Sequence, residues 1–247
     1  MPEETNQEDY ELLLPPGQED DHTMGQEEQL VKPEVRNGDV VALYTALGAT
    51  AFFLVVSWIT VLINDPTSVA WFSLHPTLQS LALSFIIYGI LTLQPTSHPK
   101  TKAAGLNRHQ LAIFVCAFPI ITLGTFAVWW NKHIRDHSHF TTWHGKLGLM
   151  CMCWILVQIG VGGGSVWFGG AAFGGGMKAK LVWRYHRISG YILFPLLLLT
   201  ANFGGLYSHW GTKYLSLPMR VLAYAIAPLV ILVAVYIRVR PSKMNIF

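Results

Sequence analysis

The sequence predicts an all-α integral membrane protein with six transmembrane helices. Hydrophobic residues make up 52% of its 247 residues and charged residues only 13%, about half the charged share of an ordinary soluble protein. The mean hydropathy is positive, at +0.38. Apolar runs of about 20 residues have the length that crosses a hydrocarbon core. Six such runs lie near residues 41–63, 71–93, 109–130, 144–167, 186–207 and 217–238.

Acidic residues are concentrated before the first apolar run. Of the 14 Asp and Glu residues, 12 lie between Glu3 and Asp39, in a segment rich in Gln and Pro and poor in aromatic residues. Such a composition buries too little apolar surface to fold. The sequence therefore predicts a disordered acidic tail over 1–39, a membrane domain over 40–240 and a short basic tail over 241–247.

Basic residues in the loops indicate the orientation of the helices. If the N-terminus is cytosolic, 12 of the 17 Lys and Arg residues lie on the cytosolic side and five on the other. Cytosolic loops carry such an excess, so both tails are predicted to be cytosolic. The expected surroundings are a lipid bilayer. No nucleic acid partner is expected, because the basic residues are confined to short loops between apolar runs.

Four histidines lie at or just inside the starts of helices two to five: His75, His109, His144 and His186. Because successive helices run in opposite directions, His75 and His144 are expected to meet near the outer face. His109 and His186 are expected to meet near the cytosolic face. Two facing imidazoles supply both axial ligands of a haem iron, which then transfers electrons because no coordination site stays open. Isolated interfacial histidines are the alternative.

The alternating pattern favours two haem b groups, each held between two histidines, and a function in trans-membrane electron transfer. The predicted helix interiors carry no Asp or Glu, the residues that proton- and ion-coupled transporters place inside the membrane. A haem-free, histidine-lined metal transporter or a membrane scaffold is the alternative function. An absorption spectrum of the purified protein separates the two.

Around these histidines the sequence resembles the cytochrome b561 family, in its six-helix branch of cytochrome b561 domain-containing proteins. The resemblance covers about residues 40–240. The motifs that carry it are Leu74-His75-Pro76, Arg108-His109-Gln110, Trp143-His144-Gly145 and Tyr185-His186-Arg187. It implies a four-helix di-haem core of helices two to five, flanked by helices one and six. It also implies an oxidoreductase with ascorbate as cytosolic donor, and monodehydroascorbate or ferric iron as acceptor across the membrane.

The resemblance further implies a site for the donor. Lys102 lies seven residues before His109, as does a lysine of the family ahead of this ligand, and basic residues near the cytosolic haem bind ascorbate in the family. Arg108, Lys180 and Arg184 are further candidates. Alternatively, these four residues only enforce the orientation of the helices.

Residues just before the helix-four ligand contact the outer haem in the family. His139 and Thr142 are therefore candidates for fixing the ligand or the haem propionates. The same loop contains His133 and His137, which together with His139 form a candidate site for a ferric substrate. The alternative is that they are solvated loop histidines.

The tail contains an acidic dileucine pattern over Glu8–Leu14. Such signals bind sorting adaptors as extended segments, although a glutamate-rich tail with three leucines also matches a loose pattern by chance. The pattern predicts an endosomal or vacuolar/lysosomal membrane, with the plasma membrane or endoplasmic reticulum as alternatives. A homodimer is left open.

Overall fold

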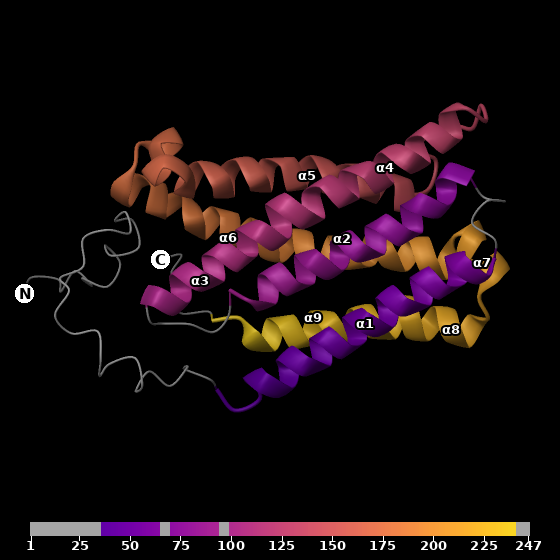
Figure 1. Cartoon of the computed structure of the whole chain (residues 1–247), viewed down its shortest axis with the longest axis horizontal. Coiled ribbons are helices and arrows are strands. Elements are labelled where there is room, and N and C mark those ends of the chain that lie inside the picture. Colours follow the sequence, from indigo (N-terminus) through magenta and orange to yellow (C-terminus); the bar gives the residue numbers. More distant parts are fainter. Residues whose placement is uncertain (1–35, 65–69, 94–98, 241–247) are drawn as a thin grey trace, which may run out of the picture.

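The computed structural model describes residues 36–64, 70–93 and 99–240. The dileucine segment Glu8–Leu14 and the tail over 241–247 lie outside these ranges. Every regular element in the described part is helical, and six stretches are long and apolar enough to cross a membrane (Figure 1). In chain order, spans one to six are Asp39–Ile63, Ala70–Leu91, Thr101–His133, Trp143–Phe173, Gly176–Tyr207 and Leu217–Arg238. The predicted all-α fold with six membrane helices is confirmed.

Several spans change helix type along their length. The elements are α1 (Asp39–Ile63); η3 (Ala70–Ser73) and α2 (Leu74–Leu91); α3 (Pro99–Gln110), η4 (Leu111–Ala117) and α4 (Phe118–His133); α5 (Trp143–Val166) and η5 (Trp167–Phe173); α6 (Gly176–Asn202) and η6 (Phe203–Tyr207); α7 (His209–Tyr214); α8 (Leu217–Val221), η7 (Leu222–Ile226) and α9 (Ala227–Arg238). Three of them, η4, η6 and η7, are single π-helical turns. Such turns insert one extra residue into a helix and are frequent at functional sites.

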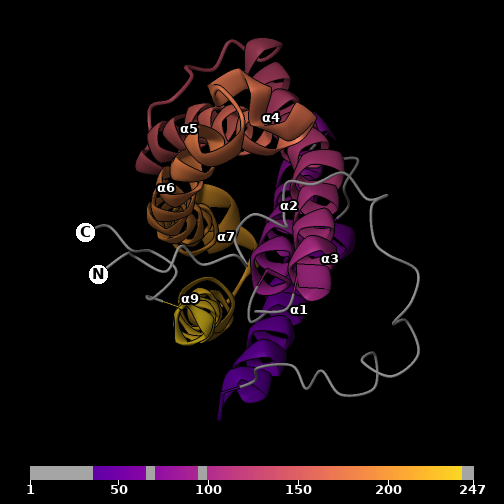
Figure 2. The ribbon, with the colours of Figure 1, turned by 90° about the vertical axis from the view of Figure 1, so that its left-hand side faces the viewer.

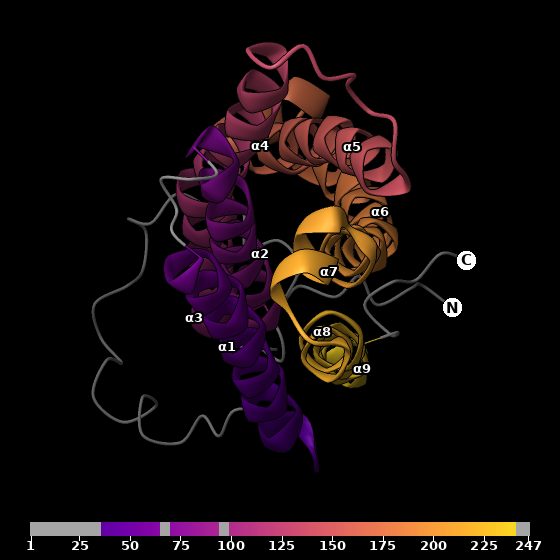
Figure 3. The same ribbon diagram turned by 90° about the vertical axis from the view of Figure 1, so that its right-hand side faces the viewer.

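The spans lie side by side along one long axis (Figure 1). Spans two and three pack together as one antiparallel pair, and spans four and five as another. Figures 2 and 3 show these four spans forming an arc that α1 and α9 close on one side. We call the end of the bundle with Asp39 and Arg238 the proximal end, and the end with Ile63 and His133 the distal end. Spans two to five form the core, and spans one and six flank it.

Helices three and five begin earlier than predicted. The sequence placed their starts at 109 and 186, whereas α3 begins at Pro99 and α6 at Gly176. The added turns carry lysines and arginines, so hydropathy does not detect them although the backbone stays helical. His109 and His186 therefore each lie ten residues inside a helix rather than at its start.

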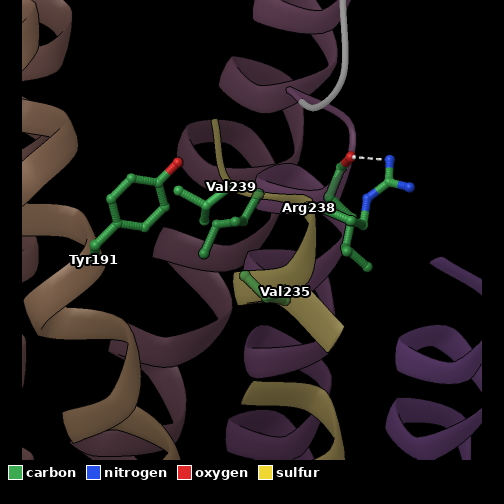
Figure 4. A pocket seen from close by; sticks show the side chains of 6 residues that line it. Tyr191, Val235, Arg238 and Val239 are labelled. Carbon is green, nitrogen blue, oxygen red and sulfur yellow. Dashed lines mark hydrogen bonds between the residues drawn. The ribbon is translucent and has the colours of Figure 1, made fainter. Parts of the chain in front are cut away.

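An ion-pair network joins the chain ends of the membrane domain. Asp39, predicted to belong to the acidic tail, begins α1 and is only 1% exposed. Arg240 donates to its Oδ2 at 2.6 Å. Arg238, 4% exposed, donates to the backbone oxygen of Asp39. It also donates to the backbone oxygen of Leu91 at 3.3 Å (Figure 4). We call Asp39, Arg238 and Arg240 the proximal clasp; it ties spans one, two and six together.

Candidate functional site

The four helix histidines form two pairs, one towards each end of the core. At the distal end, Nε2 of His75 lies 3.4 Å from Nε2 of His144, and the rings meet edge to face with centroids 5.7 Å apart. At the proximal end, the rings of His109 and His186 face each other at 6.3 Å and 82°. Each pair thus joins one histidine from spans two and three to one from spans four and five.

Spans two and three fix each other's histidines. Nδ1 of His75 in span two donates to the carbonyl oxygen of Gly124 in span three at 3.0 Å. Nδ1 of His109 in span three donates to that of Gly89 in span two at 3.1 Å. Because a carbonyl oxygen only accepts hydrogen bonds, Nδ1 carries the proton in both rings and Nε2 keeps its lone pair. Metal-bound histidines are oriented in the same way, through the second ring nitrogen.

Spans four and five fix their histidines in two different ways. Nδ1 of His144 donates to the carbonyl oxygen of Thr200 at 2.9 Å, whereas the ring of His186 is held by the side chain of Gln158. The side-chain amide of Gln158, a residue only 9% exposed, lies against the same ring. One end of this amide is 2.6 Å from Nδ1 of His186, and the other end is 2.7 Å from the backbone nitrogen of Gly190.

The four anchoring residues follow the histidine of their own span at nearly constant spacing. They are Gly89, Gly124, Gln158 and Thr200. The spacing is 14 residues in spans two, four and five, and 15 in span three. Fourteen α-helical residues rise about 21 Å, which is therefore the axial separation of the two histidine levels. These anchors were not predicted from the sequence, because three of them act through backbone oxygens that every residue has.

The extra residue of span three coincides with a π-turn. Element η4 lies between His109 and Gly124, the two residues that are 15 rather than 14 apart. A π-turn accommodates one additional residue without rotating the following helix out of register. We infer that η4 keeps His109 and Gly124 facing span two.

Two glycines bring backbone into contact with the histidine rings. A Cβ atom at Gly204 would lie 2.8 Å from Cε1 of His144, and one at Gly162 would lie 2.6 Å from Cε1 of His186. Real Cβ atoms do not approach other atoms so closely, so only glycine fits beside each ring without a shift. The rings of His144 and His186 are thus held by a hydrogen bond at one edge and by backbone on one side.

The paired histidines fit the axial ligation of a haem. Two Nε2 lone pairs facing each other repel, and an iron bound by both nitrogens removes that repulsion. Between the two levels, Leu81, Ser84, Phe85 and Tyr88 of α2 line an open groove of about 280 Å³. Within the described ranges no group of three or more His, Cys, Asp or Glu is positioned to hold a metal ion.

The loop between α4 and α5, which we call the distal loop, contains predicted residues that make two different kinds of contact. Thr142 is the N-cap of α5, and its Oγ1 accepts from the backbone nitrogen of Gly145 at 3.2 Å. It therefore fixes the start of the helix that carries the histidine two residues later. His139 stacks on Trp129, with ring centroids 5.9 Å apart, and His133 stacks on the same tryptophan at 5.4 Å. Two of the three loop histidines thus belong to an aromatic cluster at the end of span three.

The predicted basic residues lie on the helical extensions, on the proximal side of the His109–His186 pair: Lys102 and Arg108 on α3, Lys180 and Arg184 on α6. Arg184 donates to the hydroxyl of Tyr185 at 3.1 Å and lies 4.9 Å from the centre of its ring. The structure thus places positive charge at the outer rim of the proximal histidine pair, on both halves of the core.

Comparison with known proteins identifies relatives. A mouse (Mus musculus) protein named transmembrane reductase CYB561D2 is 31% identical over 181 residues, covering 69% of this chain and 77% of that protein. Proteins of the same name from Bos taurus and Homo sapiens are 31% and 32% identical over 136 residues. These matches cover 51% of this chain and 59% of each relative, so the chain spans about three fifths of their length.

A family comparison covers the whole core. The family described as eukaryotic cytochrome b561 matches residues 74–212, a range that contains all four paired histidines and their anchoring residues. This match extends over more than half of the chain. The resemblance noted in the sequence is thereby confirmed: the chain belongs to the cytochrome b561 family, a family of haem b proteins.

Proposed function

We propose that this protein is a trans-membrane reductase that carries electrons through two b haems. His75 and His144 hold the distal haem, and His109 and His186 hold the proximal one. The observation that supports this most is the geometry of the pairs, in which histidines from opposite halves of the core face each other and backbone carbonyls accept from three of the four rings. The haem supplies a one-electron carrier when bound. The protein orients the ligand rings and surrounds the cofactor with apolar side chains.

In this proposal the proximal end faces the cytosol, because basic residues are concentrated there. Lys102, Arg108, Lys180 and Arg184 attract an anionic reductant, and ascorbate is the donor that the family resemblance implies. Electrons then leave from the distal pair to monodehydroascorbate or a ferric chelate. Each electron that crosses gains or loses about 2.3 kcal/mol per 100 mV of membrane potential.

The absorption spectrum of the purified full-length chain tests the proposed cofactor. We expect a reduced b-type spectrum and about two haems per chain, as two bis-histidine sites require. A preparation that is folded but lacks this spectrum would instead support a haem-free metal transporter or scaffold. That alternative is decided by measuring metal flux in vesicles made from the same preparation.

Reconstituted vesicles test the donor and the acceptor. Ascorbate is added on the side of the proximal face, and the lumen contains either a ferric chelate or monodehydroascorbate. Reoxidation of the haems by one acceptor and not by the other identifies the substrate. Vesicles that contain the haem-free protein control for leakage of ascorbate.

Alanine at the two ring-contacting glycines is expected to perturb one haem each. Gly162→Ala places a Cβ against His186 and should alter or remove only the proximal haem. Gly204→Ala places one against His144 and should affect only the distal haem. Gly160→Ala is the matched control, since no atom lies within 4 Å of a Cβ built there. The measurement is a reductive titration of the Soret band; equal effects of all three variants contradict the assignment.

Deleting one residue from η4 is expected to preserve both haems. Val115 is 58% exposed, and its loss converts the 15-residue spacing of span three to the 14 of the other spans, with a regular α-helix in place of the π-turn. Deleting Val157, which is 59% exposed, rotates Gln158 by about 100° away from His186. This matched deletion is expected to remove the proximal haem. Haem content per chain separates the outcomes, and loss of haem in the Val115 deletion would contradict the role given to η4.

We also propose that both tails are cytosolic and that the protein resides in an endosomal or lysosomal membrane, through the adaptor signal at Glu8–Leu14. Replacing Leu12, Leu13 and Leu14 by alanine should then move the protein to the cell surface with its haem spectrum intact. Microscopy of a tagged chain measures this, and an unchanged distribution argues against the signal.

A further inference from the structure

The distal histidine pair has a support that comes from outside the four-helix core. His144 lies on the backbone of Gly204, which belongs to the π-turn η6 at the distal end of span five. The helix breaks directly after this turn, at Ser208, where the backbone becomes extended. Element η6 packs against η7 and α8 of span six as well as against its own span. The contacts that hold η6 therefore decide where Gly204 lies.

Two hydrogen bonds tie the end of span five to span six. The side-chain nitrogen Nδ2 of Asn202, just before η6, donates to the backbone carbonyl oxygen of Tyr224 at 2.6 Å. At the other end of the turn, Arg220 donates to the carbonyl oxygen of Leu206 at 2.6 Å. Tyr224 itself lies in the π-turn η7 of span six. Spans five and six are thus bonded to each other on both sides of Gly204.

The side chain of Tyr224 presses on η6 directly. A Cβ at Gly205 would lie 2.0 Å from Cγ of Tyr224, so the ring rests on bare backbone. Tyr224 is 3% exposed, and its hydroxyl hydrogen-bonds Ser57 of span one at 2.9 Å. Its ring also meets Phe53 edge to face, at 5.6 Å. Spans one and six therefore hold Gly205, whose chain neighbour Gly204 holds the ring of His144.

The proximal pair is supported differently. The ring of His186 rests on Gly162 and on Gln158, which belong to span four, and the amide of Gln158 reaches back to Ser189 of span five. All of these contacts lie within spans four and five. Among the described residues, the contacts that reach the ring of His186 thus come from within the core, whereas those that reach the ring of His144 continue into spans one and six.

We propose that Asn202 and Tyr224 are positioning residues for the distal haem, which set the orientation of the His144 imidazole and with it the reduction potential of that haem. This inference rests on the proposed haem ligation. The axial ligand and its hydrogen bonds are levers through which a protein tunes a haem. Spans one and six would then tune the distal haem through η6 and the ring of His144.

The test compares variants of the purified full-length protein by redox titration and by electron paramagnetic resonance of the ferric haems. Asn202→Leu replaces the side-chain amide by an apolar group of similar size. Tyr224→Leu removes the aromatic ring that rests on Gly205. Both are expected to shift the potential and the resonance of the distal component and to leave the proximal component unchanged. Tyr224→Phe keeps the ring and should remain close to the unmodified protein. Comparison with His144→Ala assigns the distal component.

Tyr236→Leu is the matched control. Tyr236 lies in the same span, and its hydroxyl donates to the carbonyl oxygen of Tyr191, so this variant loses a comparable contact away from η6. An unshifted distal component in Asn202→Leu and Tyr224→Leu overturns the inference, and so does an equal shift of both components. If the unmodified protein itself shows no pair of haem components, the proposed function fails, which is a distinct result. If Tyr224→Leu does not fold, Asn202→Leu still decides.

Discussion

Replacing His75 or His144 by alanine is expected to remove the same single haem. The two rings face each other with Nε2 atoms 3.4 Å apart, so loss of either one leaves an iron with one axial ligand and weakens its binding. Haem content should fall from about two to about one per chain, because the second site uses a separate pair of histidines. The measurement is the ratio of haem to protein, combined with a redox titration in which one component disappears.

The complementary pair makes the prediction specific. His109→Ala and His186→Ala should remove the proximal haem component and retain the distal component that His75→Ala and His144→Ala remove. His209→Ala controls for the loss of an imidazole, because His209 is exposed and begins α7 outside both pairs. Lower yields are expected for all four ligand variants, since bound metal contributes to folding free energy. If His75→Ala and His109→Ala lost the same component, the pairing across the core would be wrong.

The six spans were predictable because each contains an apolar run of sufficient length. The pairing of the histidines was predictable as well, because antiparallel spans bring every second helix start to the same end. The starts of α3 and α6 were not predictable from hydropathy. The first residues of these helices include Lys102 and Lys180, which lower the local hydropathy. The backbone remains helical there, so the helix begins before the apolar run does.

The anchors of the histidines could not be identified in advance because they act through backbone. Gly89, Gly124 and Thr200 contribute carbonyl oxygens, which every residue has, so their side chains carry no signal. The close approach of Gly204 to His144 is equally invisible, since the sequence contains 22 glycines. Only the recurrence of an anchor 14 residues after a histidine distinguishes these positions, and the π-turn of span three interrupts even that.

The proximal clasp was missed for a different reason. Composition assigned Asp39 to the acidic tail, since 11 of the other acidic residues precede it. Its partner Arg240 follows about 200 positions later, and no local pattern links residues so distant. The clasp forms only because α1 and α9 pack side by side (Figure 1). Its carboxylate is buried because arginine guanidinium groups replace the water that it loses.

Asp39→Asn is expected to destabilise the membrane domain more than any other single charge change. The carboxylate accepts from Arg240 at 2.6 Å and from the backbone nitrogen of Arg36 at 2.8 Å. Removing one partner of a buried ion pair typically costs about 3 to 5 kcal/mol, because the other charge is left without compensation. The uncompensated charge here lies beside Arg238, itself buried, so repulsion between the two arginines adds to the cost.

Thermal unfolding in detergent, followed by loss of the Soret band, measures this effect. Asp136→Asn is the matched control, because Asp136 is exposed in the distal loop and exposed charges contribute about 0 to 1 kcal/mol. Arg240→Gln on its own should also destabilise, whereas Asp39→Asn combined with Arg240→Gln should recover part of the loss, since neither charge is then stranded. Strictly additive losses in the double variant would show that the two side chains do not act as a pair.

The clasp also holds the carbonyl oxygen of Leu91, two residues beyond the anchor Gly89. The proximal haem should therefore be released before the distal one as Asp39→Asn unfolds.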